Sequence, residues 1–282
     1  MITALAVTIA AYGGLVTYMW LFQRKLLFRA ERIHVDPADY GLPEMRTVGL
    51  SAADGLNLRA WYLPTATPGA PVILYFHGND AHLGTRADKI RPYLDAGFGV
   101  LLMSYRGYGG NPGQPSEDGL YHDARAAIGF LTAEGTRLED VIYYGESLGS
   151  GVAVQLALEN PPAAMILEAP YTDIPTVGQR RYPFLPVRLL MKDRFDNLSK
   201  IQAIRTPVMV IHGELDRTTP VELGRTVHEA APEPKEARFY AEAAHLDLYD
   251  HGAAEDVLRF IETHHPGAAS YRRNRQVEHT EI

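Results

Sequence analysis

The chain has 282 residues, of which 46% are hydrophobic and 22% charged, a composition typical of a globular protein with a sizeable core. Its 27 Lys and Arg stand against 34 Asp and Glu, a net charge of -7, so the basic footprint of a nucleic-acid-binding protein is missing and we expect no nucleic-acid partner. The absence of cysteine excludes a thiol nucleophile, a disulfide framework and a cysteine-based zinc site.

The first segment is long and apolar. Residues 2–22 carry no charge, and as a helix they would measure about 31 Å, close to the roughly 30 Å hydrocarbon core of a bilayer. We therefore predict a transmembrane anchor over residues 1–23. Basic residues follow the segment at Arg24, Lys25, Arg29 and Arg32, and none precedes it. The positive-inside tendency then places the following domain in the cytoplasm, in a single-pass membrane protein.

Two alternatives to an anchor stay open. A cleaved signal peptide would have a basic start and a small-residue cleavage site, whereas the exit from the apolar run reads Met19-Trp20-Leu21-Phe22-Gln23. A buried helix of the domain is the other alternative, because threonines and glycines make the segment only moderately apolar.

Residues 24–45 contain Pro and Gly at several points, which predicts a juxtamembrane linker. The stretch 46–63 is typical of two strands joined at Asp54-Gly55, a strong hairpin signal. From residue 71 onward, short apolar runs alternate with helical segments. Strands that are apolar on both faces and separated by helices indicate a parallel sheet covered on both sides.

The predicted fold class is therefore α/β: a mostly parallel sheet with an antiparallel N-terminal hairpin and helices on both faces. The expected strands after the hairpin are 72–76, 100–104, 141–144, 164–167, 208–211 and 237–241, and the expected helices are 85–96, 116–134, 147–159, 221–231 and 250–264. Residues 46–265 lack a convincing internal linker and are interpreted as one domain. Within it, 170–205 is too polar and broken for a strand and predicts a short helical lid, and 266–282 is a polar tail.

A motif for nucleophilic catalysis lies at Gly145-Glu146-Ser147-Leu148-Gly149, which matches the pattern G-x-S-x-G. The pattern has a mechanical reason: where a strand turns directly into a helix, the central residue is strained and the residues two positions away must lack bulk. The apolar run 141–144 before it and the helical segment after it supply that context. We predict Ser147 as a nucleophile and Gly145 and Gly149 as the glycines that permit the turn.

A serine hydroxyl needs a base and an orienting acid, which this motif predicts in the order Ser, Asp, His. Asp216 lies in a loop after the strand expected at 208–211, and His245 lies in a loop after the strand at 237–241. Both loops then reach the carboxyl edge of the sheet, where ligands bind in open α/β folds. We predict Asp216 as the acid and His245 as the base. The rival acids are Glu214, Glu168 and Asp173, and the rival bases are His212, His251, His264 and His265.

An oxyanion hole requires backbone N–H groups aimed at the oxygen that becomes negative in the transition state. The residue after the nucleophile, Leu148, supplies one candidate. The second comes from the loop after the strand at 72–76, where His77-Gly78-Asn79 allows a close backbone approach. We predict the N–H of Asn79 as that donor.

Several ordered motifs resemble the α/β-hydrolase superfamily, and within it the short-lid, membrane-anchored serine hydrolases related to bud-emergence-type proteins, often labelled peptidase-like. They are "HGN" at 77–79, "YRGYG" at 105–109, "PSEDG" at 115–119, "GESLG" at 145–149, "HGELDRTTP" at 212–220 and "AAHLDL" at 243–248. The resemblance implies the same nucleophile, acid, base and oxyanion donors. The chain departs from it at "DAH" (80–82), where relatives usually carry a second glycine, and at "GGNPG" (109–113). His82 is then either a side chain at the substrate entrance or a solvated loop residue.

The sequence predicts a serine hydrolase that needs neither a metal nor an organic cofactor and that acts on a small acyl substrate. The anchor would contact membrane lipid and would favour amphiphilic esters, so carboxylesterase or lipase-like activity ranks first and peptidase or amidase activity second. A membrane-tethered binding module without catalysis is the third alternative, and it predicts a damaged triad. Apolar residues of the lid could wall an acyl pocket or could pack on the sheet.

Overall fold

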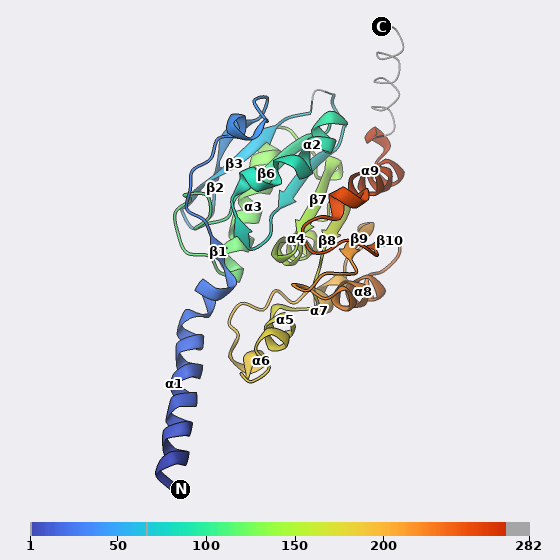
Figure 1. The fold of residues 1–282 in the computed structure, drawn as a ribbon. Coiled ribbons are helices and arrows are strands. Elements are labelled where there is room, and N and C mark those ends of the chain that lie inside the picture. The colour runs from blue at the N-terminus through green and yellow to red at the C-terminus, as the bar shows by residue number, and fades with distance from the viewer. Residues whose placement is uncertain (1, 66, 269–282) are drawn as a thin grey trace.

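The structure is a computed structural model that describes residues 2–65 and 67–268 (Figure 1). The predicted polar tail from residue 269 onward lies outside the described residues. Eight strands of the described chain form the main sheet, in the order β10-β9-β8-β7-β4-β6-β3-β2. The strands are β2 Arg46–Ser51, β3 Asn57–Leu63, β4 Val72–Phe76, β6 Gly99–Met103, β7 Val141–Glu146, β8 Ala164–Glu168, β9 Val208–Gly213 and β10 Lys235–Tyr240.

The sheet is antiparallel only at its N-terminal edge. Strand β2 pairs antiparallel with β3 around the Asp54-Gly55 turn, and β3 pairs antiparallel with β6. The remaining pairs, from β6 through β4 to β10, are parallel. The predicted fold class is confirmed, because the hairpin and the apolar runs lie where the sequence predicts them.

Helices cover both faces of the sheet (Figure 1). One face packs against α3 Glu117–Ala133, α4 Leu148–Glu159, α7 Asn197–Ile201 and α8 Val221–Ala230, and the other packs against α2 Ala87–Asp95 and α9 Ala253–His264. Alternate side chains of one strand enter the two cores: Leu74 and Phe76 of β4 enter the first, and Ile73 and Tyr75 enter the second. This two-sided burial explains why the central strands are apolar throughout.

The lid segment contains two short helices, α5 Ile174–Arg181 and α6 Val187–Leu190, before α7. Short 3-10 turns lie at η1 Pro37–Tyr40, η2 Leu83–Arg86, η3 Leu138–Asp140 and η4 Leu248–His251. In Figure 1 α5 and α6 lie at the end of the domain toward which the N-terminal helix leads.

The N-terminal helix α1, Ile2–Leu27, projects from the domain (Figure 1). By length and composition it is one helix that could cross a membrane, with a mean hydropathy of 1.6 over Thr3–Leu27 and no part of its apolar window buried. The chain then enters β1, Arg29–Ala30, which pairs in parallel with β5, Asp80–Ala81. Phe28, the residue between α1 and β1, is buried in the core of the domain. The end of α1 is therefore joined to the domain by packing and by strand pairing.

Candidate active site

Ser147 lies on the turn between β7 and α4 and has φ 50° and ψ -114°. A positive φ is uncommon for a residue with a side chain, and such strain costs about 1–3 kcal/mol. The turn is held by the N–H of Ser147, which donates to the carbonyl of Glu168 at 2.8 Å. Because α4 begins at the next residue, the side chain stands at the carboxyl edge of the sheet.

The two glycines of the motif occupy positions where a side chain would collide with backbone. A Cβ on Gly145 would lie 2.7 Å from the carbonyl oxygen of Gly149. A Cβ on Gly149 would overlap the carbonyl oxygen of Phe76. The close approach of α4 to β4 and β7 thus explains both glycines.

Asp216 and His245 meet at the same edge. His245 Nδ1 lies 2.6 Å from Asp216 Oδ2, and the aspartate side chain is fully buried. The other carboxylate oxygen accepts hydrogen bonds at 2.8 Å from the N–H groups of Thr218 and Thr219. The aspartate is therefore fixed by its own loop, and it orients the imidazole with its Nδ1 inward.

The electrostatics of the pair favour charge on both partners. Burial would raise the pKa of Asp216, but hydrogen bonds from His212 and His245 outweigh it and hold the pKa well below its usual value. Burial would lower the pKa of His245, but the hydrogen bond to Asp216 and its charge outweigh that effect and raise the pKa above its ordinary value of 6.5. The aspartate thus stabilises the protonated imidazole.

The rival residues have other partners. Glu214 pairs with Arg225 at the surface, Asp173 caps α5, and the buried Glu168 binds Lys89. His212 is buried behind Asp216, where its Nε2 lies 2.8 Å from the carbonyl of Thr219 and 3.2 Å from Asp216 Oδ2. A carbonyl can only accept, so His212 donates from Nε2 and supports the aspartate.

The remaining histidines lie elsewhere. His251 is exposed in η4, His264 lies near Glu236, and the buried His265 lies near Asp140. His82 accepts a hydrogen bond from the N–H of Gly84 and caps η2. Of the candidate bases, His245 is the one among the described residues that lines the cavity at Ser147.

The candidate oxyanion donors flank Ser147. Leu148 opens α4, so its N–H is one of the first-turn donors that a helix leaves without an internal partner. Asn79 is held by the end of α1: its side-chain Nδ2 donates to the carbonyl of Leu27 at 2.9 Å, and its own carbonyl accepts from the N–H of Arg29 at 2.9 Å. The tether fixes the side chain and the carbonyl of Asn79 and leaves its N–H as the candidate donor.

A cavity of about 580 Å³ lies over these groups, with Ser147, Leu148, His245 and Asn79 in its wall. The lid supplies much of the remaining wall, including Val177, Tyr182, Leu185, Val187, Leu190 and Met191. The end of α1 supplies another part, from Val16 to Leu27. The cavity thus joins a polar reaction centre to an apolar chamber, which is typical of a small-molecule site.

Comparison with known proteins agrees with this fold. The family described as "Serine aminopeptidase, S33" matches residues 68–195. An uncharacterized protein of Mycobacterium tuberculosis is 38% identical over 258 residues, covering 90% of this chain and 92% of that protein. An esterase from Pyrococcus furiosus superposes with a TM-score of 0.68 at 18% identity, covering 84% of this chain and 97% of that one. The chain belongs to the α/β-hydrolase superfamily.

The name of another relative states its substrate. The lysophosphatidylserine lipase ABHD12 of Xenopus tropicalis is 32% identical over 211 residues, which cover 67% of this chain and 53% of that protein. The names of these relatives support hydrolase activity for this α/β-hydrolase. They include both a peptidase family and a lipase, so they leave the class of bond open.

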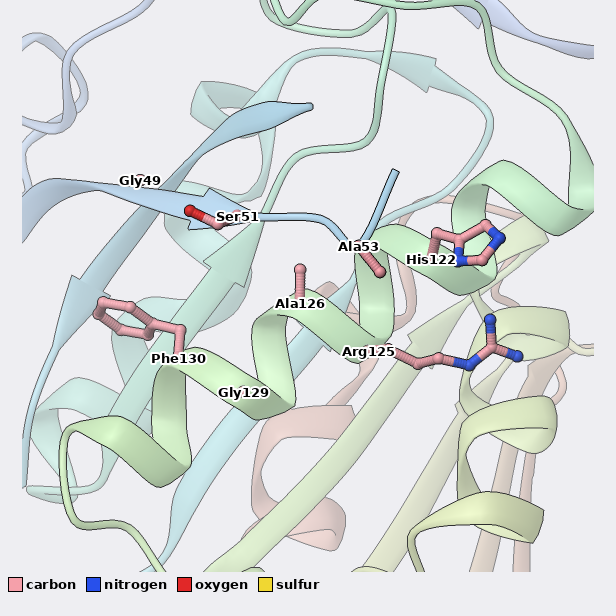
Figure 2. A pocket seen from close by; sticks show the side chains of 8 residues that line it. All are labelled: Gly49, Ser51, Ala53, His122, Arg125, Ala126, Gly129 and Phe130. Carbon is pink, nitrogen blue, oxygen red and sulfur yellow. The ribbon is translucent and has the colours of Figure 1, made fainter. Parts of the chain in front are cut away.

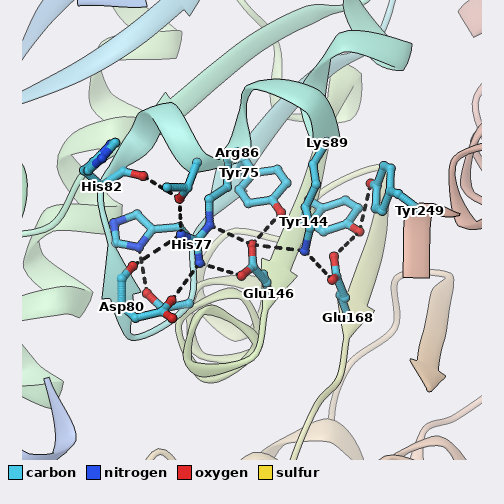
Figure 3. Close-up of polar contacts among 12 residues, drawn as sticks. Tyr75, His77, Asp80, His82, Arg86, Lys89, Tyr144, Glu146, Glu168 and Tyr249 are labelled. Atoms are coloured by element: carbon cyan, nitrogen blue, oxygen red, sulfur yellow. Dashed lines mark hydrogen bonds and ion pairs between the residues drawn. The ribbon is translucent and has the colours of Figure 1, made fainter. Parts of the chain in front are cut away.

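A buried charge network beneath the nucleophile was not predicted from the sequence. Glu146 accepts from Arg86 Nη2 at 2.6 Å and from Arg86 Nε at 3.1 Å, and it also accepts from Tyr75 at 2.7 Å. Lys89 binds Glu168 at 2.6 Å and lies 3.7 Å from Glu146 (Figure 3). Glu146 is the variable second position of the motif, so the pattern carries no signal for its role. The network links α2 to the strands that hold Ser147.

A smaller cavity of about 380 Å³ lies between β2 and α3 (Figure 2). Gly49 and Ser51 face Ala126, Gly129 and Phe130 across it, and His122 and Arg125 stand at one end (Figure 2). Arg125 is already engaged by Glu159 through two hydrogen bonds of 2.7 Å. The residues around it offer no nucleophile paired with a base, so the cavity at Ser147 is the candidate active site. The described residues also contain no group of three or more His, Asp or Glu side chains placed to hold a metal ion.

Proposed function

We propose that this protein is a serine hydrolase that cleaves carboxylic esters through an acyl-enzyme, with Ser147 as nucleophile, His245 as base and Asp216 as acid. The observation that carries the proposal is the 2.6 Å contact between His245 Nδ1 and Asp216 Oδ2 in the wall of the cavity that also contains Ser147. A strained serine beside such a pair has the parts that acyl transfer requires.

In the proposed reaction Ser147 Oγ bonds to the acyl carbon while His245 Nε2 takes the hydroxyl proton. The carbonyl oxygen becomes negative and accepts hydrogen bonds from the N–H groups of Asn79 and Leu148. Collapse breaks the ester C–O bond, and the imidazolium returns its proton to the leaving alkoxide. Water then repeats the sequence on the acyl-enzyme and releases the acid, and Asp216 stabilises the imidazolium in both halves.

The chamber favours an amphiphilic ester over a peptide. Its apolar walls from the lid and α1 suit one acyl chain. The rim carries four exposed arginines, and among the described residues no ion pair engages them: Arg29, Arg180, Arg181 and Arg217. Guanidinium groups bind carboxylate and phosphate well, so a single-chain ester with an anionic headgroup fits both ends of the cavity. The name of the ABHD12 relative agrees with this class.

We also propose that α1 anchors the protein as a single transmembrane helix, with residues 1–23 in the bilayer, 24–45 linking it to the hydrolase domain of 46–265, and the domain in the cytoplasm. The length and hydropathy of α1 support the anchor. The basic residues Arg24 and Lys25 in its last turn support the orientation.

A fluorophosphonate probe tests the mechanism, because it phosphonylates an activated serine. Full-length wild-type protein in detergent is expected to be labelled, and Ser147→Ala is expected to lose the label. Ser199→Ala, at an exposed serine on α7, is the control that keeps it. An unlabelled wild type, or a label that persists in Ser147→Ala, would overturn the mechanism and favour a binding module.

The second candidate function is peptidase or amidase activity, which the "Serine aminopeptidase, S33" description favours. Turnover of monoacyl lipid esters with anionic and zwitterionic headgroups should be compared with turnover of aminoacyl amides. We expect ester cleavage with preference for the anionic headgroup, and Arg180→Ala should reduce that preference about tenfold, the weight of one charge-assisted contact. Cleavage of the amides with negligible ester turnover would reverse the ranking.

A further inference from the structure

Helix α1 presents one face to the active-site cavity. The residues on that face are Val16, Met19, Trp20, Gln23, Leu26 and Leu27. Their spacing of three and four positions defines a single stripe along the last three turns of the helix. The lid packs opposite this stripe, so the cavity lies between the lid and the helix.

Polar contacts bind the lid to α1 at two levels of the helix. Near the domain, Arg24 binds Asp193 through two hydrogen bonds of 2.7 and 3.0 Å. Gln23 accepts from the N–H of Lys192 at 2.8 Å. Far along the helix, the hydroxyl of Tyr12 donates to the carbonyl of Phe184 at 2.8 Å. These contacts fix the height of the lid along the helix axis.

If α1 spans a bilayer, the position of the lid along the helix places part of the lid below the membrane surface. Lys192 Nζ lies 4.0 Å from the centre of the Trp20 ring, a pairing of residue types that belongs to the membrane–water interface. Tyr12 lies eight residues further toward the N-terminus, about 12 Å deeper at 1.5 Å per residue. The carbonyl of Phe184 is hydrogen-bonded to Tyr12. Phe184 would therefore lie within the hydrocarbon of the leaflet on the side of the domain. Figure 1 shows α6 beside the part of α1 nearest the domain.

The carbonyl groups of the lid between α5 and α6 are hydrogen-bonded within the protein, as an environment without water would require. Each carbonyl from Tyr182 to Arg188 accepts a hydrogen bond within the protein. Side chains supply the bonds that local turns do not: Gln179 serves Pro183 and Tyr12 serves Phe184. A loop in water could leave these groups to solvent, whereas in lipid each unpaired group costs several kcal/mol.

The outer surface of the lid is apolar where it faces away from the cavity. Phe184 is 59% exposed and Leu189 is 81% exposed, and neither lines the cavity. Of the charged residues that flank them, Arg181 lines the cavity, and Arg188 Nη2 donates to Thr176 Oγ1 at 3.3 Å.

From these observations we infer that the part of the lid from Tyr182 to Met191 is immersed in the lipid leaflet beside α1, and that the acyl chain of the substrate enters the cavity from the bilayer between the lid and the helix. The inference rests on the proposed anchor and ester chemistry.

Depth measurement tests the immersion directly. The chain has no cysteine, so a cysteine at Leu189 can be labelled alone with an environment-sensitive fluorophore in full-length protein in lipid nanodiscs. Matched single cysteines replace Ile9, an exposed residue of the anchor, and Glu255, an exposed residue of α9. The labels at Leu189 and Ile9 are expected to be quenched by doxyl-labelled lipids, and the label at Glu255 by aqueous iodide.

The three labels separate the possible failures. Iodide quenching at Leu189 together with lipid quenching at Ile9 would overturn the immersed lid and leave the anchor intact. Iodide quenching at Ile9 would overturn the anchor and the lid inference together. Neither result bears on the fluorophosphonate reaction of Ser147, which tests the chemistry separately.

Kinetics test lateral entry. Leu189→Glu places a charge on the outer face of the lid, which should lower kcat/KM for a monoacyl lipid in vesicles by about tenfold or more. Turnover of a short-chain, water-soluble ester should not change. Leu158→Glu, at an exposed leucine of α4, is the control that leaves both unchanged. Equal losses on both substrates in Leu189→Glu, or no loss on the vesicle substrate, would overturn the inference.

Discussion

His245 carries the pH dependence of the proposed reaction, because its two ring nitrogens have separate tasks. Nδ1 is bound to Asp216 at 2.6 Å, which leaves Nε2 to exchange the proton with Ser147. The base must be neutral to accept that proton. Because the hydrogen bond and charge of Asp216 raise the pKa of His245 despite its burial, protonation begins to inhibit the enzyme at a higher pH than for a free imidazole.

We therefore predict that kcat/KM for a soluble ester falls as the pH decreases, with an apparent pKa above 6.5. Asp216→Asn should shift this fall in activity to lower pH and reduce kcat by about 10⁴-fold, since the imidazole of His245 loses its carboxylate partner. A pH–rate profile from about pH 4.5 to 9 measures both effects. His251→Gln, at an exposed histidine of η4, is the control. An apparent pKa of 6.5 or lower for kcat/KM of the wild type would contradict the prediction.

The strand–turn–helix formed by β7 and α4 is the element that exposes Ser147, and its geometry depends on backbone contact. Helix α4 comes so close to β4 that only a hydrogen atom fits between Gly149 and the carbonyl of Phe76. The same closeness keeps the first N–H groups of α4 near the nucleophile. A change that disturbs the packing at this contact is therefore expected to disturb the candidate oxyanion hole as well.

Gly149→Ala is expected to lower the free energy of unfolding by about 3 kcal/mol, because the added methyl group must displace backbone. Gly129→Ala is the matched control. Gly129 is an exposed glycine inside α3 with nothing within 4 Å of the place that a methyl group would take, so the change should be neutral or raise stability by about 0.5–1 kcal/mol. Thermal unfolding in detergent measures both. Equal midpoints for the two variants would contradict the proposed packing.

Across the whole molecule, the buried charges join α2 to the centre of the sheet. Burial alone would raise the pKa of Glu146, but the charges of Lys89 and Arg86 outweigh it and hold the pKa well below its usual value. The folded-state pKa lies below the unfolded value of about 4.3, so this stabilisation is fully present above that pH and is lost as the pH falls. The loss amounts to about 1.4 kcal/mol per pH unit until the folded pKa is reached.

Glu146→Gln is expected to cost about 3–5 kcal/mol at pH 7, because Arg86 loses its buried partner. The difference from wild type should narrow as the pH falls from about 5 to 3, where the wild-type carboxylate is also losing its advantage. Melting temperatures of both proteins across this range measure the effect. Glu134→Gln breaks the more exposed pair with Arg46 and should cost less than about 1 kcal/mol at every pH. A constant gap between Glu146→Gln and wild type would contradict the assignment.

The sequence by itself determined the fold class, because strands buried on both faces must be apolar throughout and parallel strands require crossover helices. It also placed Ser147, Asp216 and His245 in loops at one edge, since each follows a predicted strand. It favoured Asp216 over Glu214 in the same loop, but it could not show what either side chain contacts. In the structure the N–H groups of Thr218 and Thr219 hold Asp216 toward His245, whereas Glu214 pairs with Arg225 at the surface.

Only the tertiary structure decided what α1 and its neighbours contact. Helix α1 is apolar nearly all round and has no contrast between a polar and an apolar face, so its cavity-lining stripe leaves no pattern in the sequence. The tether from Leu27 to Asn79 and the contact from Tyr12 to Phe184 join residues far apart in the chain. Periodicity reports only on local structure, and such pairings arise when distant elements pack.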